Sequence, residues 1–275
     1  MEQAVLATSA GPLLRDWRRR RRMSQLELAL EADVSTRHLS FVETGRSRPS
    51  ADMVVRLADE LDIPLRDRNQ ILLAAGHAPA YAHHELGEPA MGAAREALER
   101  VLTGHEPFPA LAVDRHWGLV AGNAAVPALI AGVAEELLEP PVNVLRLALH
   151  PAGLAPRIAN LAEWRAHLLD RLARQAAASG DPALATLYAE LEDYPSPTAD
   201  APRCSTAAEQ IAVPLRLRHS TGELAFISTV TTFGTALDIT LAELAVESFF
   251  PADRATAEIV HGWPRAPAGG HPGGS

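Results

Sequence analysis

The segment covering residues 24–50 decides the fold of the N-terminal part and reads SQLELALEADVSTRHLSFVETGRSRPS. Ser24 is followed three residues later by Glu27, which is the capping-box pattern that begins an α-helix. Ser35 and Ser50 are N-cap residue types that precede two further apolar segments. The segment therefore predicts a helix directly after the capping box, a tight turn, and further helices after Ser35 and Ser50.

Two residues of this segment suit the backbone conformation found where helices end. Gly45 can adopt the left-handed region, and Asp33 is among the residues that tolerate a positive φ in a turn. Apolar residues recur at helical spacing on either side, in the sets Leu13, Leu14 and Trp17; Leu26, Ala29 and Leu30; Val34, Leu39 and Val42; Met53, Val54, Leu57 and Leu61; and Ile71, Leu72 and Ala75. We therefore expect an all-α domain of five helices over residues 11–75.

Charge is distributed unevenly along the chain. The 275 residues carry a formal net charge of -9, and nearly half of them (47%) are apolar, which is enough for about two folded domains. Residues 11–50 nevertheless hold nine Arg against five acidic residues, a balance of +4. A basic segment in an acidic protein is typical of a local phosphate-binding surface.

Several protein classes are disfavoured by composition. Cys204 is the one cysteine, which rules out an intrachain disulfide and fits a reducing cytoplasm. The N-terminus lacks the pattern of a signal peptide. The uncharged stretch 117–134 contains a proline and is too weakly apolar to span a bilayer, so we expect no membrane partner and a cytoplasmic protein.

After Pro109 the pattern changes to strands mixed with helices. Strands are expected at 111–113, 119–121, 211–218 and 224–232, and helices at 123–131 (capped by Asn123), 157–178 and 182–191. Residues 244–250 could form a strand or a helix, and a strand is favoured. This order predicts an α+β domain over residues 107–265, with an antiparallel sheet and helices on one face. Residues 76–106 are expected to be a connector with a helical stretch at 93–102, and residues 266–275 a disordered tail.

The region 11–75 resembles the lambda-repressor-like, xenobiotic-response-element family of helix-turn-helix regulators. The resemblance rests on the segment 24–50 quoted above, with Asp33 where the family usually has glycine. It implies that the helix beginning at Thr36 lies in the major groove of DNA. It also implies an internal ion pair between Arg18 and Glu43.

The resemblance assigns DNA contacts by position. Arg37 is the expected base reader, because a guanidinium matches the O6 and N7 of guanine. Phe41 is expected either at a thymine methyl or against a dimer partner. The whole expected set, with Gln25, Ser35, Arg46 and Arg48 on phosphates, is Gln25, Ser35, Thr36, Arg37, His38, Ser40, Phe41, Arg46 and Arg48. The alternative for the run Arg18–Arg22 is a merely solvated charged surface.

The C-terminal part resembles PAS-like sensor domains in residues 110–124, and the ligand-binding domain of MmyB-like regulators in 143–151, 160–165 and 229–235. The second resemblance implies a small, mainly apolar, fatty-acid-like ligand. Candidate ligand-binding residues are Trp117, Asn143, Arg146, His150, Trp164, Thr229, Thr231 and Phe233, among which Arg146 would suit a carboxylate. The alternative for each is a structural role.

The sequence favours a homodimeric regulator over an enzyme. It contains no phosphate-binding glycine loop and no nucleophile elbow, so no cofactor and no catalysis are expected. His77, His83, His84 and His105 lack the spacing of metal ligands. Two functions remain open for the C-terminal domain, which are sensing a ligand, or serving only as a dimerisation or protein-interaction module.

Overall fold

The computed structural model describes residues 9–195 and 213–263, and the chain divides into two compact units. Unit 1 comprises the residues up to Glu85 together with Gly234–Ala242. Unit 2 comprises Leu86–Phe233 and the residues from Glu243 onward. Cys204 and the tail predicted for residues 266–275 lie outside the described residues.

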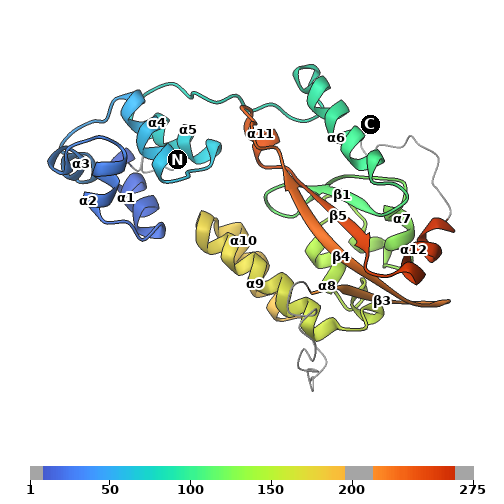
Figure 1. The fold of residues 1–275 in the computed structure, drawn as a ribbon. Coiled ribbons are helices and arrows are strands. Elements are labelled where there is room, and N and C mark those ends of the chain that lie inside the picture. Colours follow the sequence, from blue (N-terminus) through green and yellow to red (C-terminus); the bar gives the residue numbers. More distant parts are fainter. Residues whose placement is uncertain (1–8, 196–212, 264–275) are drawn as a thin grey trace, which may run out of the picture. The chain divides into compact units, whose positions relative to one another are not determined.

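Unit 1 contains the five predicted α-helices (Figure 1), which are α1 (Ala10–Arg20), α2 (Gln25–Glu31), α3 (Thr36–Glu43), α4 (Ala51–Glu60) and α5 (Leu65–Ala74). Ser24 and Glu27 form the capping box at α2. Ser35 Oγ accepts from the backbone N–H of His38 at 3.1 Å, and Ser50 caps α4 in the same way. The predicted helix starts are therefore confirmed, and Asp33 and Gly45 take φ values of 52° and 73°.

The core of unit 1 corrects one predicted helix face. Leu28 and Ala29 are the buried residues of α2, because this side of the helix faces α3 and α4. Leu26 and Leu30 are 58% and 71% exposed, so their predicted place in the core is wrong. The other four predicted faces enter the core, with Leu13 and Val34 only partly buried at its margin.

Unit 2 is built on an antiparallel five-stranded sheet of the described residues, in the order β2-β1-β5-β4-β3. The strands are β1 (Ala110–Val113), β2 (Leu119–Gly122), β3 (Leu215–His219), β4 (Gly222–Thr232) and β5 (Ala245–Pro251). The predicted hairpins β1–β2 and β3–β4 are confirmed, and the run 244–250, for which a strand was favoured over a helix, forms β5. The first two residues of the run predicted from 211 lie outside the described residues.

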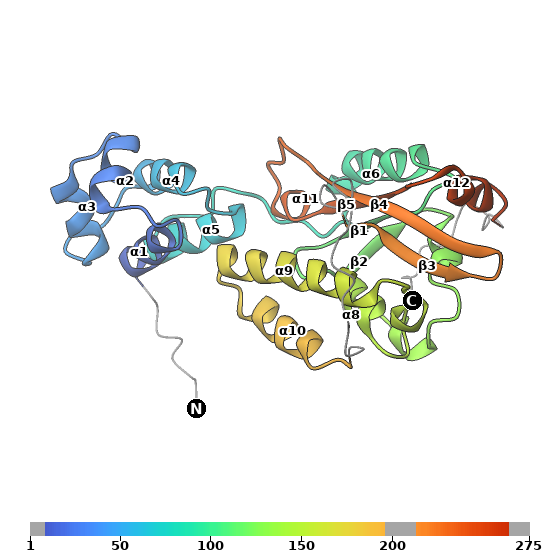
Figure 2. The ribbon, with the colours of Figure 1, turned by 60° about the horizontal axis from the view of Figure 1, so that its bottom comes forward.

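Helices cover both faces of this sheet, which corrects the prediction of one face. Leu111 and Val113 point into the main core of unit 2. Ala110 and Ala112 point the opposite way and are also buried, since α6 (Gly92–Gly104) packs on β1. Figure 2 shows α6 on one side of the sheet, with α8, α9 and α10 on the other.

The remaining helices of unit 2 partly match the sequence. They are α7 (Val126–Leu129), α8 (Val144–Leu149), α9 (Leu161–Ser179), α10 (Pro182–Glu192) and α12 (Arg254–His261); α11 (Ile239–Ala242) belongs to unit 1, and short 3₁₀ segments lie at Pro89–Met91, Glu135–Leu137 and Ala155–Arg157. The predicted helix 123–131 is shorter. Asn123 is buried, donates through Nδ2 to the carbonyls of Leu102 and Phe108, and accepts from Ala110 N–H through Oδ1. It therefore ties β1 to α6 and does not cap a long helix.

Candidate functional site

The N-terminal end of α3 presents polar side chains to solvent. Thr36, Arg37 and His38 are exposed, whereas Leu39 and Val42 of the same helix are buried in unit 1. Unpaired backbone N–H groups and the helix dipole make such an end favourable for phosphate. Thr36, Arg37 and His38, three of the residues that sequence analysis assigns to DNA, therefore share one exposed helix end.

Two serines flank this exposed end. Ser35 is exposed, and because its Oγ acts as acceptor for His38 N–H, its hydroxyl hydrogen can still be donated to a phosphate. Ser40 is half-buried, and its carbonyl accepts from Thr44 Oγ1 at 2.7 Å. Ser35 therefore presents a hydroxyl donor to solvent, and Ser40 lies at the edge of the exposed surface.

The Phe41 ring lies near two guanidinium groups. The Cζ atom of Arg37 is 5.5 Å from the centre of the Phe41 ring, and that of Arg46 is 6.0 Å from it. The Phe41 carbonyl also accepts from the N–H groups of Arg46 (2.8 Å) and Ser47 (3.1 Å). Its ring and backbone thus hold the loop after α3 against the helix, a packing role that sequence analysis did not foresee.

A buried carboxylate organises the base of the same surface. Glu43 Oε1 lies 2.7 Å from Arg18 Nε, and its Oε2 accepts from Arg18 Nη2 (2.9 Å) and from Gln25 Nε2 (2.7 Å). The predicted ion pair is therefore confirmed. Burial alone would raise the pKa of Glu43, but the hydrogen bonds from Arg18 and Gln25 outweigh it and hold that pKa below its ordinary value. Gln25 keeps a second amide hydrogen for a phosphate.

Arg48 has an internal role that differs from its predicted one. Its Nη2 donates to the Gly76 carbonyl at 2.7 Å, and its Nε donates to the Ala75 carbonyl. These carbonyls end α5, where a cation is favourable. The guanidinium is therefore largely committed to tying the segment before α4 to the end of α5, which leaves Arg46 as the better phosphate-binding candidate.

The arginine run at the end of α1 is more than a solvated surface. Arg21 Nε and Nη2 donate to the carbonyls of Leu61 (2.7 Å) and Asp62 (2.8 Å), which end α4. Arg20 and Arg21 also place their guanidinium groups over the Trp17 ring. Part of this positive charge therefore has a structural function.

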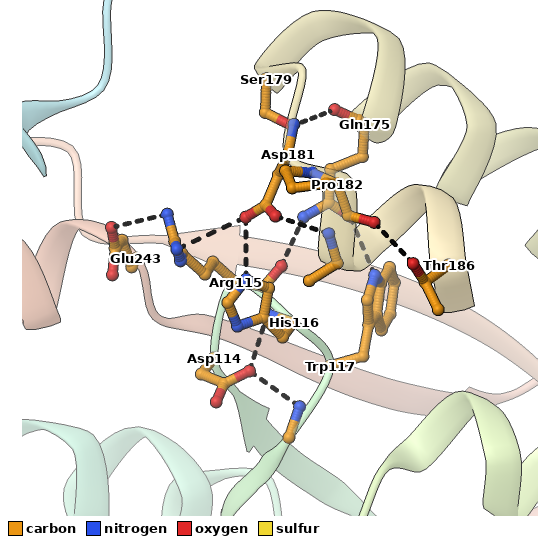
Figure 3. A network of polar contacts seen from close by, with 12 residues as sticks. Asp114, Arg115, His116, Trp117, Gln175, Ser179, Asp181, Pro182, Thr186 and Glu243 are labelled. Atoms are coloured by element: carbon orange, nitrogen blue, oxygen red, sulfur yellow. Dashed lines mark hydrogen bonds and ion pairs between the residues drawn. The ribbon is translucent and has the colours of Figure 1, made fainter. Parts of the chain in front are cut away.

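In unit 2, the turn between β1 and β2 is fixed to the helical hairpin α9–α10 (Figure 3). Asp181 Oδ2 lies 2.8 Å from His116 Nε2 and 3.4 Å from Arg115 Nη2. Gln175 Nε2 donates to the Arg115 carbonyl at 2.8 Å. Burial would raise the pKa of Asp181, but the hydrogen bonds from His116 and from Ala183 N–H, together with the charge of Arg115, hold that pKa below its ordinary value.

This turn presents Trp117 in a constrained conformation. Trp117 has a φ of 68°, which is uncommon for a bulky residue and marks stored strain. Asp114 Oδ1 accepts from the N–H groups of His116 and Gly118, both at 2.8 Å, which closes the turn. Trp117 Nε1 donates to Gln175 Oε1 at 2.9 Å. The indole is buried, with its backbone fixed by the turn and its ring N–H fixed by Gln175.

The Trp117 ring lies beside an ion pair formed by Arg171 and Glu247. The Arg171 Cζ lies 4.4 Å from the centre of the indole, and Arg171 Nη1 donates to Glu247 Oε1 at 3.4 Å. Glu247 lies on β5 and is 5% exposed. Burial raises the pKa of Glu247, and Arg171 and a hydrogen bond from Ser228 only partly offset it. A buried carboxyl with a raised pKa is typical of a functional site.

The other predicted ligand residues on α8 have partners within the protein. Arg146 Nε and Nη2 bind Glu190 at 2.8 and 2.7 Å, so the expected carboxylate partner of Arg146 is supplied by the chain itself. Asn143 caps α8 and bonds the His116 carbonyl. His150 Nδ1 accepts from Ala152 N–H at 3.0 Å. All three have the structural role that was the alternative for them.

The remaining candidates are not brought together. Trp164 is buried in the core and stacks on His167. Thr229 and Thr231 are exposed on β4. Val230 is the cross-strand partner of Glu247 and shares its face of the sheet. Its neighbours Thr229 and Thr231 therefore point to the opposite face. Trp117 is thus the predicted residue that lies at the Arg171–Glu247 pair, and Phe233 is half-buried at the end of β4.

Sequence analysis missed Arg171, Gln175 and Glu247. Arg171 and Gln175 are spaced i, i+4 on α9, so one helix face carries both toward Trp117. A charged residue in the apolar run 244–250 was a usable signal for Glu247, because a charge inside a central strand needs a partner.

The described residues show neither a metal-binding cluster nor a helix able to cross a membrane. Within residues 9–195 and 213–263, no cluster of three or more His, Cys, Asp or Glu side chains could hold a metal ion. The described helices include none with the length and apolarity needed to cross a bilayer. His77 and His105 instead lie within hydrogen-bond distance of backbone carbonyls.

Comparison with protein families gives two matches. Residues 14–67 match the model of a helix-turn-helix, and residues 94–261 match the model of the MmyB-like transcription regulator ligand binding domain. The first match includes α2 and α3, and the second includes Trp117, Arg171 and Glu247. No curated protein matches the chain.

Proposed function

The chain belongs to the MmyB-like transcription regulators, with an N-terminal DNA-binding helix-turn-helix and a C-terminal ligand-binding domain, and from that premise we propose how each part acts. Unit 1 reads a specific double-stranded DNA site through α3. The C-terminal domain, in the cytoplasm, takes up a small, mainly apolar, fatty-acid-like ligand that changes DNA binding. Catalysis forms no part of this proposal.

The DNA-reading proposal rests chiefly on the two guanidinium groups that lie near the Phe41 ring. Arg37 lies at the exposed N-terminal end of α3, and Arg46 lies in the loop that follows the helix. A base reader and a phosphate contact are expected at those places in a helix-turn-helix. Gln25, bound to Glu43, supports a further phosphate contact from α2.

The ligand proposal is supported by the Trp117–Arg171–Glu247 group. The Glu247 contact uses one Arg171 nitrogen at 3.4 Å, and a guanidinium has five N–H donors, so a ligand carboxylate can bind beside or in place of Glu247. The strained Trp117 supplies an apolar face next to this cation. Among the arginines, Arg171 therefore replaces Arg146 as the proposed carboxylate anchor.

Two experiments test these roles. Selection of bound duplexes from a random DNA pool by the full chain should give one recurring site; binding of all sequences alike would contradict specific reading. Protein purified from producing cells should release a fatty-acid-like molecule, seen by mass spectrometry after denaturing extraction. Arg171→Gln should reduce the recovered amount, and Arg174→Ala, an exposed Arg on the same helix, should not.

A second candidate function, dimerisation by the C-terminal domain, is favoured by an exposed apolar pair. Ile227 on β4 and Phe250 on β5 are cross-strand partners that are 39% and 44% exposed. We propose a homodimer in which this sheet face contributes. Sedimentation at micromolar concentration should show a dimer that Ile227→Lys converts to a monomer; a wild-type monomer on and off DNA would exclude it.

A further inference from the structure

The connection between β4 and β5 is unusual because it leaves its own unit. β4 ends at Thr232 and β5 begins at Ala245, which is far more than the roughly two to five residues of an ordinary hairpin loop. The stretch Gly234–Ala242 belongs to unit 1, although both strands belong to unit 2. Long ordered connections of this kind are usually functional.

Within unit 1 this stretch is docked on the segment that follows α5. Asp238 forms an isolated parallel bridge with Ala82, and Ile239 N–H donates to the Ala82 carbonyl at 2.9 Å. Ile239 is 3% exposed, and α11 packs on α5. The contact therefore has both an apolar and a hydrogen-bonded part.

Asp238 and Thr240, at the start of α11, hold His84 at its backbone N–H, its ring Nδ1 and its carbonyl. Asp238 Oδ2 accepts from His84 N–H at 3.2 Å and lies 2.8 Å from His84 Nδ1. Thr240 Oγ1 donates to the His84 carbonyl at 2.6 Å. Burial would raise the pKa of Asp238, but hydrogen bonds from His84 and from backbone N–H groups lower it.

The same segment is held on its other side by α5. Asn69, a buried residue of α5, donates through Nδ2 to the Tyr81 carbonyl at 2.8 Å. Asn69 Oδ1 accepts from the N–H groups of Ala80 (2.9 Å) and Tyr81 (3.1 Å). Residues 80–84 are thus bonded both to α5 and to the start of α11, and α1 and α4 pack on α5.

The other end of the connection is tied into the ligand-binding unit. Glu243 directly follows α11 and lies 3.8 Å from Arg115, which lies 3.4 Å from Asp181 (Figure 3). Farther along β5 is Glu247, the partner of Arg171. A change at the Trp117–Arg171–Glu247 group would therefore reach both β5 and the turn that holds Glu243.

We propose that Gly234–Ala242 is the coupling segment of this regulator, and that Asp238, acting through His84, transmits the state of unit 2 to the DNA-binding helices. The proposal rests on the proposed ligand regulation, but its test does not, because allosteric coupling is reciprocal. If the state of unit 2 changes the affinity for DNA, bound DNA must shift the state of unit 2 by the same coupling free energy. DNA can therefore be used as the probe.

The experiment is hydrogen exchange of the full chain with and without the duplex selected from the random pool. Bound DNA should protect α3 and change exchange at Ala245–Pro251 by several-fold. Asp238→Asn keeps an oxygen to cap α11 but presents an NH₂ group to His84 N–H. In this variant the α3 protection should remain and the β5 response should disappear.

The matched control is Asp253→Asn, which alters the N-cap of α12 within unit 2 and should keep the β5 response. Thr240→Val, which removes the bond to the His84 carbonyl, should weaken the response and serves if Asp238→Asn does not fold. An unchanged β5 response in both coupling-segment variants, or none in the wild type, would overturn the proposal. A parallel titration with palmitate addresses only the ligand class: failure to bind contradicts the proposed fatty-acid-like ligand and leaves the DNA arm intact.

Discussion

Arg18 and Glu43 join the first and third helices of the DNA-binding unit through two hydrogen bonds of 2.7 and 2.9 Å. The Glu43 side chain is 1% exposed and the Arg18 side chain 11%. Gln25 of α2 binds the same carboxylate, so three helices meet at one buried charge. A charge in this position is stable only while its partners are present.

Arg18→Ala should therefore destabilise the protein rather than change its sequence preference. Removing one partner of a buried ion pair costs about 3–5 kcal/mol, because the other charge is left uncompensated. We expect a lower melting temperature and equally weakened binding of cognate and random DNA. Thermal unfolding and competition binding check this, and a loss confined to one base pair would instead place Arg18 at the DNA.

The same carboxylate predicts a pH dependence of stability. The pKa of Glu43 is lower in the folded protein than in the unfolded chain, so its contribution is fully present above the unfolded pKa, about 4.3. It is lost as pH falls through the folded pKa. The difference in unfolding free energy between wild type and Glu43→Gln should shrink below about pH 4.3. A difference that stays constant from about pH 3 to 7 would contradict this.

Arg37→Ala should relax sequence preference at one base pair. A bidentate Arg–guanine contact is worth about 1–3 kcal/mol of discrimination, and Arg37 is exposed at the end of α3. Arg37→Lys is the matched variant, because it keeps the charge but loses the planar fork. Affinities for single-base variants of the selected site measure this. Unchanged preference in both variants would mean that another residue reads the base.

Arg46→Ala should weaken binding of all sequences about equally and reduce the salt slope by about one. The reason is that a phosphate contact releases counterions without reading a base. Arg48→Ala is the informative comparison, since Arg48 bonds the Ala75 and Gly76 carbonyls. It should lower the melting temperature more than Arg46→Ala does. DNA binding measured across salt concentrations, together with thermal unfolding, distinguishes the two variants. If Arg48→Ala had the larger effect on the salt slope and Arg46→Ala the larger effect on the melting temperature, Arg48 would be the phosphate contact.

The sequence by itself determined the helix-turn-helix. Ser24, Ser35 and Ser50 cap their helices within three residues of their own position, and Asp33 adopts its positive φ inside the turn it forms. Such interactions are local, so a short stretch of sequence contains both partners. The strands of unit 2 could also be predicted, because the alternation of apolar and polar residues and the residues of tight turns are local signals.

Only the tertiary structure decided which side chains share a site. Arg171 and Glu247 are 76 positions apart, and His84 and Asp238 are 154 apart, so no spacing rule relates them. The sequence allowed Arg146 as a ligand anchor, but in the structure its guanidinium binds Glu190 of α10. Leu26 and Leu30 fit a helical stripe equally well, but the neighbouring helices pack on Leu28 and Ala29 instead. A periodic pattern gives the relative orientation of side chains on one element, and the packing of other elements decides which of them is buried.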